Sequence, residues 1–134
     1  MRDAQQLLAD AKVIAVVGAS RDPRKAAHTV PLQMQRHGWR IIPVNPFVDE
    51  LFGERVYRSV AEIPFPVDLV NVFRPAADAP DVVRDAIAAG APAVWLQLDI
   101  VSPEARQLAT EAGLDYVENR CTAVERAVGN LSRA

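Results

Sequence analysis

The sequence predicts an α/β fold: a doubly wound, five-stranded parallel sheet with helices on both faces. Two observations predict it. Short apolar runs rich in β-branched residues alternate five times with segments of helical periodicity along the 134 residues. Several of these runs end at Gly or Asn, which are typical of the turns that follow strands. Such alternation requires right-handed crossovers between parallel strands, and the simplest arrangement is a Rossmann-like sheet in the order 3-2-1-4-5, numbered along the chain.

Length and composition fit a single domain over residues 1–134. Half of the residues are hydrophobic, and the formal net charge of -2 gives no nucleic-acid signature. The single cysteine, Cys121, excludes an internal disulfide and a cysteine-based metal site. No apolar run approaches membrane-spanning length, and the N-terminal segment lacks the apolar core of a signal peptide. We therefore expect a cytoplasmic protein that binds neither nucleic acid nor membranes.

In the first half of the chain, the spacing of apolar residues predicts two helices and two strands. Apolar residues at helical intervals predict a short amphipathic helix over 3–11, and the unbroken apolar run over 13–17 predicts a strand buried on both faces. A second helix is expected over 28–37, where Gly38 suits a C-terminal cap. The second strand is expected over 40–44, ended by an Asn-Pro pair.

The middle of the chain is less regular. A short strand is expected at Val56 and Tyr57, and Ser59 with Glu62 has the spacing of a capping box that opens a short helix. The third strand is expected over 67–73. The helix that follows becomes regular near Pro80 and stops at Gly90.

The last third of the chain repeats the strand and helix pattern twice. The fourth strand is expected over 93–96, and Ser102 followed by Pro103 is a suitable start for the next helix, which ends at Gly113. The fifth strand is expected over 115–118. Thr122 and Glu125 then have capping-box spacing and predict a C-terminal helix.

The main candidate for a ligand site is the turn after the first strand. Gly18 allows a ligand to approach the backbone, Ser20 adds a hydroxyl, and Arg21, Arg24 and Lys25 add positive charge. Exposed N–H groups at the start of the following helix also favour an anion. This combination is typical of a phosphate-binding loop. The alternative is that Gly18 only makes the turn and that the cations are solvated.

Ligands of doubly wound sheets bind beyond the carboxyl ends of the strands, where the winding reverses. This rule selects five segments before any chemistry is considered: 18–25, 44–46, 73–75, 97–99 and 119–121. The loop has one glycine where the NAD fingerprint requires G-x-G-x-x-G, and the tip of the second strand reads V-N-P without the acidic residue that holds a ribose. A Walker A loop is also absent, so nicotinamide binding is disfavoured without being excluded.

Six short motifs resemble the small stand-alone CoA-binding proteins of bacteria and archaea, the YccU-like group. They are I-A-V-V-G-A-S at 14–20, I-I-P-V-N-P at 41–46, L-F-G-E at 51–54, P-V-D-L-V-N-V-F-R at 66–74, V-W-L-Q at 94–97 and N-R-C at 119–121. The resemblance covers nearly the whole chain in order. This group is similar to the CoA-binding domain of the succinyl-CoA synthetase alpha subunit without its ligase partner domains.

The resemblance implies a coenzyme A site at the edge selected above. The residues implied to hold the phosphates of the ADP moiety are Gly18, Ala19 and Ser20, helped by Arg21, Arg24 or Lys25. Those implied to border the adenosine half are Val44, Asn45 and Pro46. Those implied to line the wall along the third strand are Phe73, Arg74 and Pro75, and Gln97 is implied to approach the pantetheine arm. The residues themselves also favour CoA over NAD. The extra 3′-phosphate of CoA calls for more cations than NAD does, and the loop carries three.

The remaining reactive residues favour structural roles. His37 precedes the Gly38 helix stop, where a cation suits the helix dipole, and His28 could meet a ligand or simply lie exposed at a helix start. Cys121 at the ligand edge could form a mixed disulfide with CoA, but an inert buried cysteine is favoured. Arg74 and Asp99 are expected to orient a loop or a ligand rather than to form a catalytic pair. Trp39 and Trp95 are interpreted as core or subunit-contact residues.

The sequence therefore favours a protein that binds CoA or an acyl-CoA without catalysis of its own, acting as a carrier, sensor or regulator. Ligase chemistry in the related synthetases needs a phosphorylated histidine and a grasp domain outside this domain. Two enzymatic alternatives stay open: an NAD(P)-dependent oxidoreductase with a divergent loop, or the CoA-binding subunit of a multi-subunit CoA ligase or transferase. A further alternative is an interaction module with a vestigial pocket. No metal site and no catalytic residue are assigned.

Overall fold

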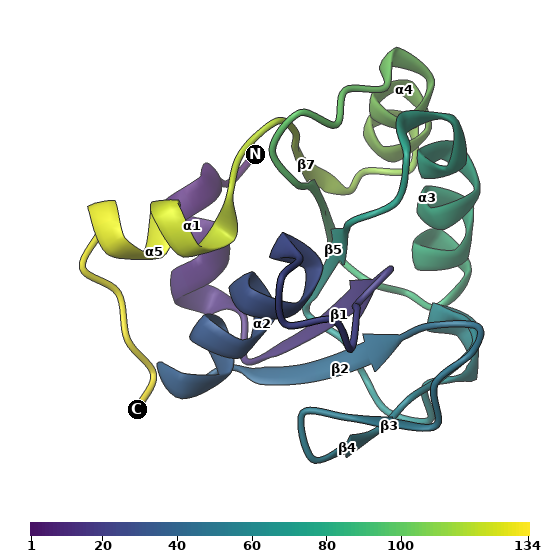
Figure 1. Ribbon diagram of the computed structural model, residues 1–134. Coiled ribbons are helices and arrows are strands. Elements are labelled where there is room, and N and C mark those ends of the chain that lie inside the picture. Colours follow the sequence, from purple (N-terminus) through teal and green to yellow (C-terminus); the bar gives the residue numbers. More distant parts are fainter.

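The computed structural model describes residues 1–134 and confirms the α/β fold with a Rossmann-like parallel sheet (Figure 1). The sheet strands are β1 (Val13–Val17), β2 (Arg40–Val44), β5 (Leu69–Val72), β6 (Ala93–Leu96) and β7 (Asp115–Val117). All neighbouring strands pair in parallel, in the order β2-β1-β5-β6-β7. The first strand therefore lies inside the sheet, with hydrogen-bonded neighbours on both sides.

The predicted strand order 3-2-1-4-5 is wrong in one respect. The third long strand, β5, pairs with β1 instead of lying outside β2, so the order in the same numbering is 2-1-3-4-5. After β2 the chain forms a two-stranded hairpin, β3 (Glu50–Leu51) and β4 (Glu54–Arg55), and a one-turn 3-10 helix, η1 (Val60–Glu62). Because η1 packs against α3, on the face opposite to α2, a right-handed crossover must return across β1.

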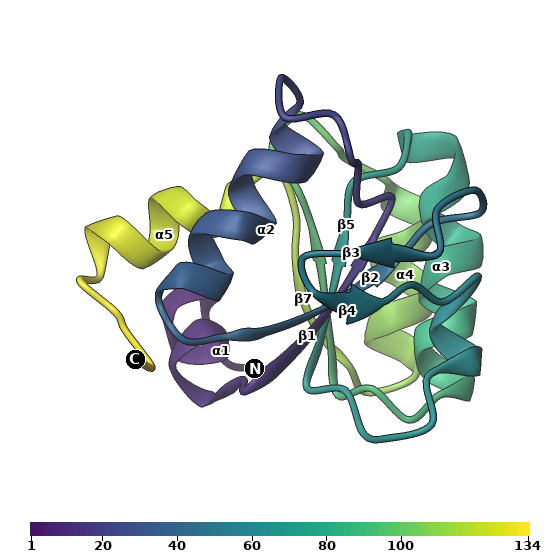
Figure 2. The same ribbon diagram turned by 60° about the horizontal axis from the view of Figure 1, so that its bottom comes forward.

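Helices cover both faces of the sheet, as predicted. On one face lie α1 (Ala4–Asp10), α2 (Ala26–Arg36) and α5 (Thr122–Val128); on the other lie α3 (Ala79–Ala88) and α4 (Pro103–Glu111). Figure 2 shows the two groups on opposite sides of the sheet, which is seen nearly on edge. None of these helices combines the length and the apolar character that crossing a membrane requires.

The side chains of each strand alternate between two cores, one on each face of the sheet. Ala15 and Val70 belong to the core under α3 and α4, whereas Ile14 and Val16 belong to the core under α1 and α2. Trp39 and Trp95 are buried in the second core, which confirms their interpretation as core residues. Their indole N–H groups donate to the carbonyls of Leu8 (3.0 Å) and Arg120 (2.8 Å), respectively.

The predicted helix cap at Ser102 is confirmed, because its side chain accepts a hydrogen bond from Ala105 N. The two predicted capping boxes are wrong. Ser59 makes no capping bond, and Glu62 instead accepts from Arg58 N. Thr122 is the first residue inside α5 rather than its cap, and from that position its hydroxyl cannot reach the free amides; it is buried and has no hydrogen-bond partner.

Element boundaries shift at two other places. The short strand expected at Val56 and Tyr57 is replaced by β4 just before it, and Tyr57 forms only an isolated bridge with Val44. The helix expected from residue 28 begins at Ala26, which brings the start of α2 closer to the predicted phosphate loop.

Candidate functional site

The corrected strand order brings three of the predicted segments together at the carboxyl edge of the sheet. The segments that follow β1 and β2 leave the sheet at the same edge (Figure 1). The amide of Gly18 donates to the carbonyl of Val44 at the end of β2 (3.0 Å). On the other side of β1, the amide of Phe73 donates to the carbonyl of Val17 (2.8 Å). The start of the loop therefore lies between the ends of β2 and β5, at the point where the winding reverses.

Gly18 is required at this point by both its conformation and its surroundings. Its φ is +88°, a value that L side chains rarely adopt. A Cβ atom at Gly18 would lie 3.1 Å from the carbonyl oxygen of Phe73 and 3.1 Å from Cδ of Arg74. The loop can therefore pass this close to the end of β5 only because residue 18 has no side chain.

The loop from Gly18 to Lys25 is closed by its own hydrogen bonds. The amide of Ser20 donates to the carbonyl of Ala27 (3.1 Å), and the hydroxyl of Ser20 accepts from Asp22 N (3.0 Å). His28, in the first turn of α2, donates from Nδ1 to the carbonyl of Ser20 (2.7 Å). Ala19 is completely buried. Ala19 and the amide of Ser20 therefore shape the loop from inside, and the groups open to a ligand lie further along it.

The start of α2 is the part of the loop that is open to an anion. Its N-cap residue, Lys25, makes no side-chain capping bond. The amides of Ala26 and Ala27, in the first helical turn, donate to no protein group. Free amides at the positive end of an eleven-residue helix favour a negatively charged ligand.

The three cations of the loop are not equivalent. Arg24 donates from Nε and from its terminal nitrogen to the two carboxylate oxygens of Asp22, both at 3.0 Å. This hydrogen bond lowers the pKa of the Asp22 carboxyl below its ordinary value, so Arg24 is held by a charged partner. Arg21 and Lys25 are exposed and form no ion pair. They are the two cations available to a ligand at the start of α2.

The tip of β2 is connected to the loop through Asn45. Its Nδ2 donates to the carbonyl of Ala19 (2.8 Å), and its Oδ1 accepts from Phe47 N (2.7 Å) and Val48 N (3.2 Å). Val44 is buried, and Pro46 is exposed. Both polar atoms of the Asn45 side chain are thus engaged by the protein, which the sequence did not indicate.

The predicted wall along β5 is partly formed. Phe73 is half-buried, and Pro75 precedes the short 3-10 helix η2 (Ala76–Asp78). Arg74 is exposed and forms an ion pair with Asp78 (2.8 Å). Asp99 lies elsewhere, and its amide donates to the side chain of Asn119, so Arg74 and Asp99 do not form a pair.

Gln97 is at the end of β6, two strands from β1, and it is buried. Its Oε1 accepts from Asn71 Nδ2 (3.4 Å) and from Thr122 N (3.5 Å). The side chain therefore joins β5, β6 and the start of α5. Asn71 was not among the residues predicted for the site; its signal in the sequence is an amide inside an otherwise apolar strand, which predicts a buried polar contact.

Of two other candidate residues, Cys121 differs from expectation and His37 agrees with it. Cys121 is half-buried, not fully buried, and lines a cavity of about 500 Å³ together with Leu98 and Val124. His37 Nδ1 donates to the carbonyl of Gln33 (2.9 Å) at the end of α2, in agreement with a structural role. No group of three or more His, Cys, Asp or Glu side chains is placed to hold a metal ion.

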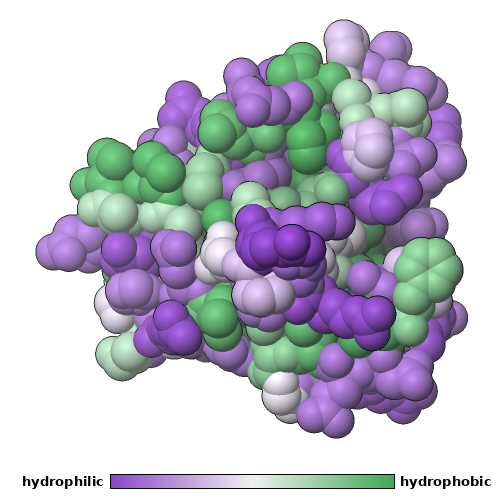
Figure 3. Space-filling view, viewed as in Figure 1, coloured by the Kyte–Doolittle hydropathy of each residue, from purple (hydrophilic) through white to green (hydrophobic).

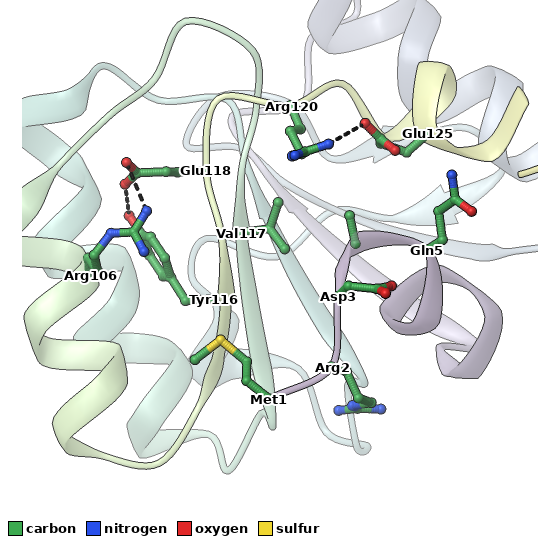
Figure 4. Close-up of a pocket in the computed structure, with 11 residues that line it drawn as sticks. Met1, Arg2, Asp3, Gln5, Arg106, Tyr116, Val117, Glu118, Arg120 and Glu125 are labelled. Atoms are coloured by element: carbon green, nitrogen blue, oxygen red, sulfur yellow. Dashed lines mark hydrogen bonds and ion pairs between the residues drawn. The ribbon is translucent and has the colours of Figure 1, made fainter. Parts of the chain in front are cut away.

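A larger cavity, of about 640 Å³, lies away from the loop, between the N-terminal segment and β7 (Figure 4). Four of its charged side chains form two ion pairs, Arg106 with Glu118 (3.2 Å) and Arg120 with Glu125 (2.9 Å). Burial, together with the hydrogen bond to Glu118, raises the pKa of the Tyr116 phenol, which stays protonated as a donor. These two ion pairs leave none of the four side chains free to bind a ligand as an unpaired charge.

Three comparisons identify related proteins. A family model described as CoA binding domain matches residues 12–127. The uncharacterized protein YneT of Bacillus subtilis (strain 168) is 40% identical over 124 residues, covering 92% of this chain and 92% of YneT. A solved structure described as cell-free ID.343 from Thermus thermophilus has a TM-score of 0.89 and 39% identity, covering 95% of this chain and 98% of that one.

A more distant match connects the chain with ligases. The alpha subunit of the ADP-forming acetate–CoA ligase II of Pyrococcus furiosus is 41% identical over 63 residues. These residues are 46% of this chain and 14% of that subunit. The similarity therefore concerns one segment of a much longer protein.

Proposed function

The chain belongs to the CoA binding domain family, and on that premise we propose that it binds coenzyme A or an acyl-CoA at the carboxyl edge of the sheet. In this proposal Arg21, Lys25 and the first-turn amides of α2 hold the phosphates, and Gly18 and Ser20 shape the loop. The observation that carries the proposal is the uncapped start of α2, preceded in the loop by two unpaired cations.

The rest of the ligand follows the two neighbouring strand ends. The adenosine half lies over the tip of β2, at Val44, Asn45 and Pro46. The pantetheine arm passes Phe73, Arg74 and Pro75 towards Gln97. Support comes from the hydrogen bonds that join the loop to both strand ends, because they fix the three segments relative to one another.

We propose further that the chain acts without catalysis of its own, as a carrier, sensor or regulator. The groups near the loop that could act as a nucleophile and its base are engaged otherwise. The hydroxyl of Ser20 accepts from Asp22 N, and His28 is bound to the carbonyl of Ser20 rather than to its hydroxyl. Neither residue has the neighbour that an activated nucleophile needs.

Isothermal titration with three ligands tests the proposed function. We expect CoA to bind about tenfold more tightly than dephospho-CoA, because the 3′-phosphate adds a charged contact worth about 1.5 kcal/mol. NAD is expected to bind more weakly than either, since the tip of β2 carries Asn45 where dinucleotide enzymes have an acid. Equal affinity for all three ligands, or no binding of any, would contradict the proposal. Tighter binding of NAD would favour the oxidoreductase alternative.

A second candidate function is that of a CoA-binding subunit in a multi-subunit ligase, which the match to a ligase alpha subunit favours. If so, affinity purification from cells should recover a second chain with a nucleotide-binding ligase domain. The purified complex should form acyl-CoA from CoA, a carboxylic acid and ATP, whereas this chain alone should not. Recovery of the chain without any such partner would speak against this function.

A further inference from the structure

Phe47 is the most exposed large hydrophobic residue of the protein, with 88% of its surface open to solvent. It belongs to the turn that follows β2. Single exposed apolar side chains are common on protein surfaces and need no explanation by themselves. The face drawn in Figure 3 is mostly hydrophilic, with separate hydrophobic areas. What distinguishes Phe47 is how firmly its turn is held and where the turn lies.

The backbone on both sides of Phe47 is fixed by hydrogen bonds. Asn45 Oδ1 accepts from the amides of Phe47 (2.7 Å) and Val48 (3.2 Å). The guanidinium of Arg58 donates to the carbonyls of Asn45 (2.8 Å) and Val48 (2.7 Å). Val48 packs against the core on the α1 and α2 face. The turn is therefore anchored while the phenyl ring of Phe47 packs against little of the protein.

The same turn is joined to the predicted phosphate loop. Asn45 Nδ2 donates to the carbonyl of Ala19, and the amide of Gly18 donates to the carbonyl of Val44. In doubly wound sheets, a ligand whose phosphates lie after the first strand extends its nucleoside over the tip of the second. The exposed ring of Phe47 is at this tip, where the base of such a ligand would bind.

We propose that the ring of Phe47 stacks against the adenine of coenzyme A, an inference that rests on the proposed function. Adenine offers a large π-face, and stacking removes one face of the base and one face of Phe47 from water. No polar group of the protein has to be displaced, since Asn45 and Arg58 bond to the backbone of the turn. The contact would make the protein prefer ligands with a base over a phosphopantetheine without one.

The test compares two ligands with matched variants by isothermal titration. Phe47→Ala is expected to weaken CoA binding about tenfold, which is about 1.4 kcal/mol. Phe47→Leu, which keeps an apolar side chain without the π-system, is expected to recover only part of this loss, and Phe47→Tyr to retain nearly all of the affinity. 4′-Phosphopantetheine, which lacks the adenosine, is expected to bind wild type and Phe47→Ala equally. A thermal melt of each variant should match wild type, because the ring is exposed.

A direct signal comes from Phe47→Trp. The tryptophan fluorescence of this variant should fall on addition of CoA, beyond any change in wild type, whose Trp39 and Trp95 are buried. If wild type binds CoA and Phe47→Ala binds it equally well, this inference is wrong and the proposed function stands. If Phe47→Ala loses affinity for both ligands alike, stacking on adenine is also wrong. If wild type does not bind CoA, both the inference and the proposed function fail.

Discussion

Replacing Gly18 by alanine is expected to destabilise the protein by about 3 kcal/mol and to weaken coenzyme A binding by at least tenfold. The positive φ of +88° alone costs an L residue about 1–2 kcal/mol. The added methyl group would also lie 3.1 Å from the carbonyl oxygen of Phe73, so β5 or the loop must move. Movement there separates the proposed phosphate loop from the end of β5, which is why stability and binding should fall together.

Gly90→Ala is the matched control for this prediction. Gly90 also has a positive φ, of +75°, but a Cβ atom there meets nothing within 4 Å. Gly90 lies just after α3, away from the loop that follows β1. Urea denaturation should therefore show a loss of only about 1–2 kcal/mol, and titration with CoA should show no change. Equal losses of stability in the two variants would mean that the contact with β5 has no energetic role.

The order of the strands was harder to predict than the strands themselves. The five apolar runs identify their strands because a strand buried on both faces must be apolar throughout. The order depends on which face the chain crosses after β2, and that crossover contains only a hairpin and one turn of 3-10 helix. The face of the crossover is set by three apolar residues that pack into the core under α3 and α4: Val60, Ile63 and Val67. Local spacing in the sequence does not reveal which core they join.

Within the candidate site, the sequence indicated the kinds of residue better than their partners. It predicted a basic loop after β1, but not that Asp22 binds one of the three arginine and lysine side chains. It predicted Asn45 at the tip of β2, but not that this amide joins the loop to the turn carrying Phe47. Each polar group can choose among several neighbours, and the choice is made by the three-dimensional arrangement of the backbone.

Of the three loop cations, only Arg24 is paired within the protein, so we expect the other two, Arg21 and Lys25, to have a large effect on CoA binding. Simultaneous replacement of Arg21 and Lys25 by alanine should weaken CoA binding about 30-fold at low ionic strength. Each exposed cation is taken to contribute about 1 kcal/mol to phosphate binding, less than a buried charged hydrogen bond would. Neither side chain has a protein partner to lose, so the melting temperature should stay close to that of wild type.

The double variant Lys12→Ala/Arg36→Ala separates this local effect from the loss of net charge. It also removes two positive charges, but Lys12 precedes β1 at the opposite edge of the sheet and Arg36 lies in the last turn of α2. Neither forms an ion pair. Titrations at rising salt should show wild type losing affinity steeply and the Arg21/Lys25 variant losing little, because screening weakens contacts that this variant no longer makes. Should the two double variants behave alike, the phosphates must bind elsewhere, since a site at the start of α2 cannot be indifferent to which two cations are removed.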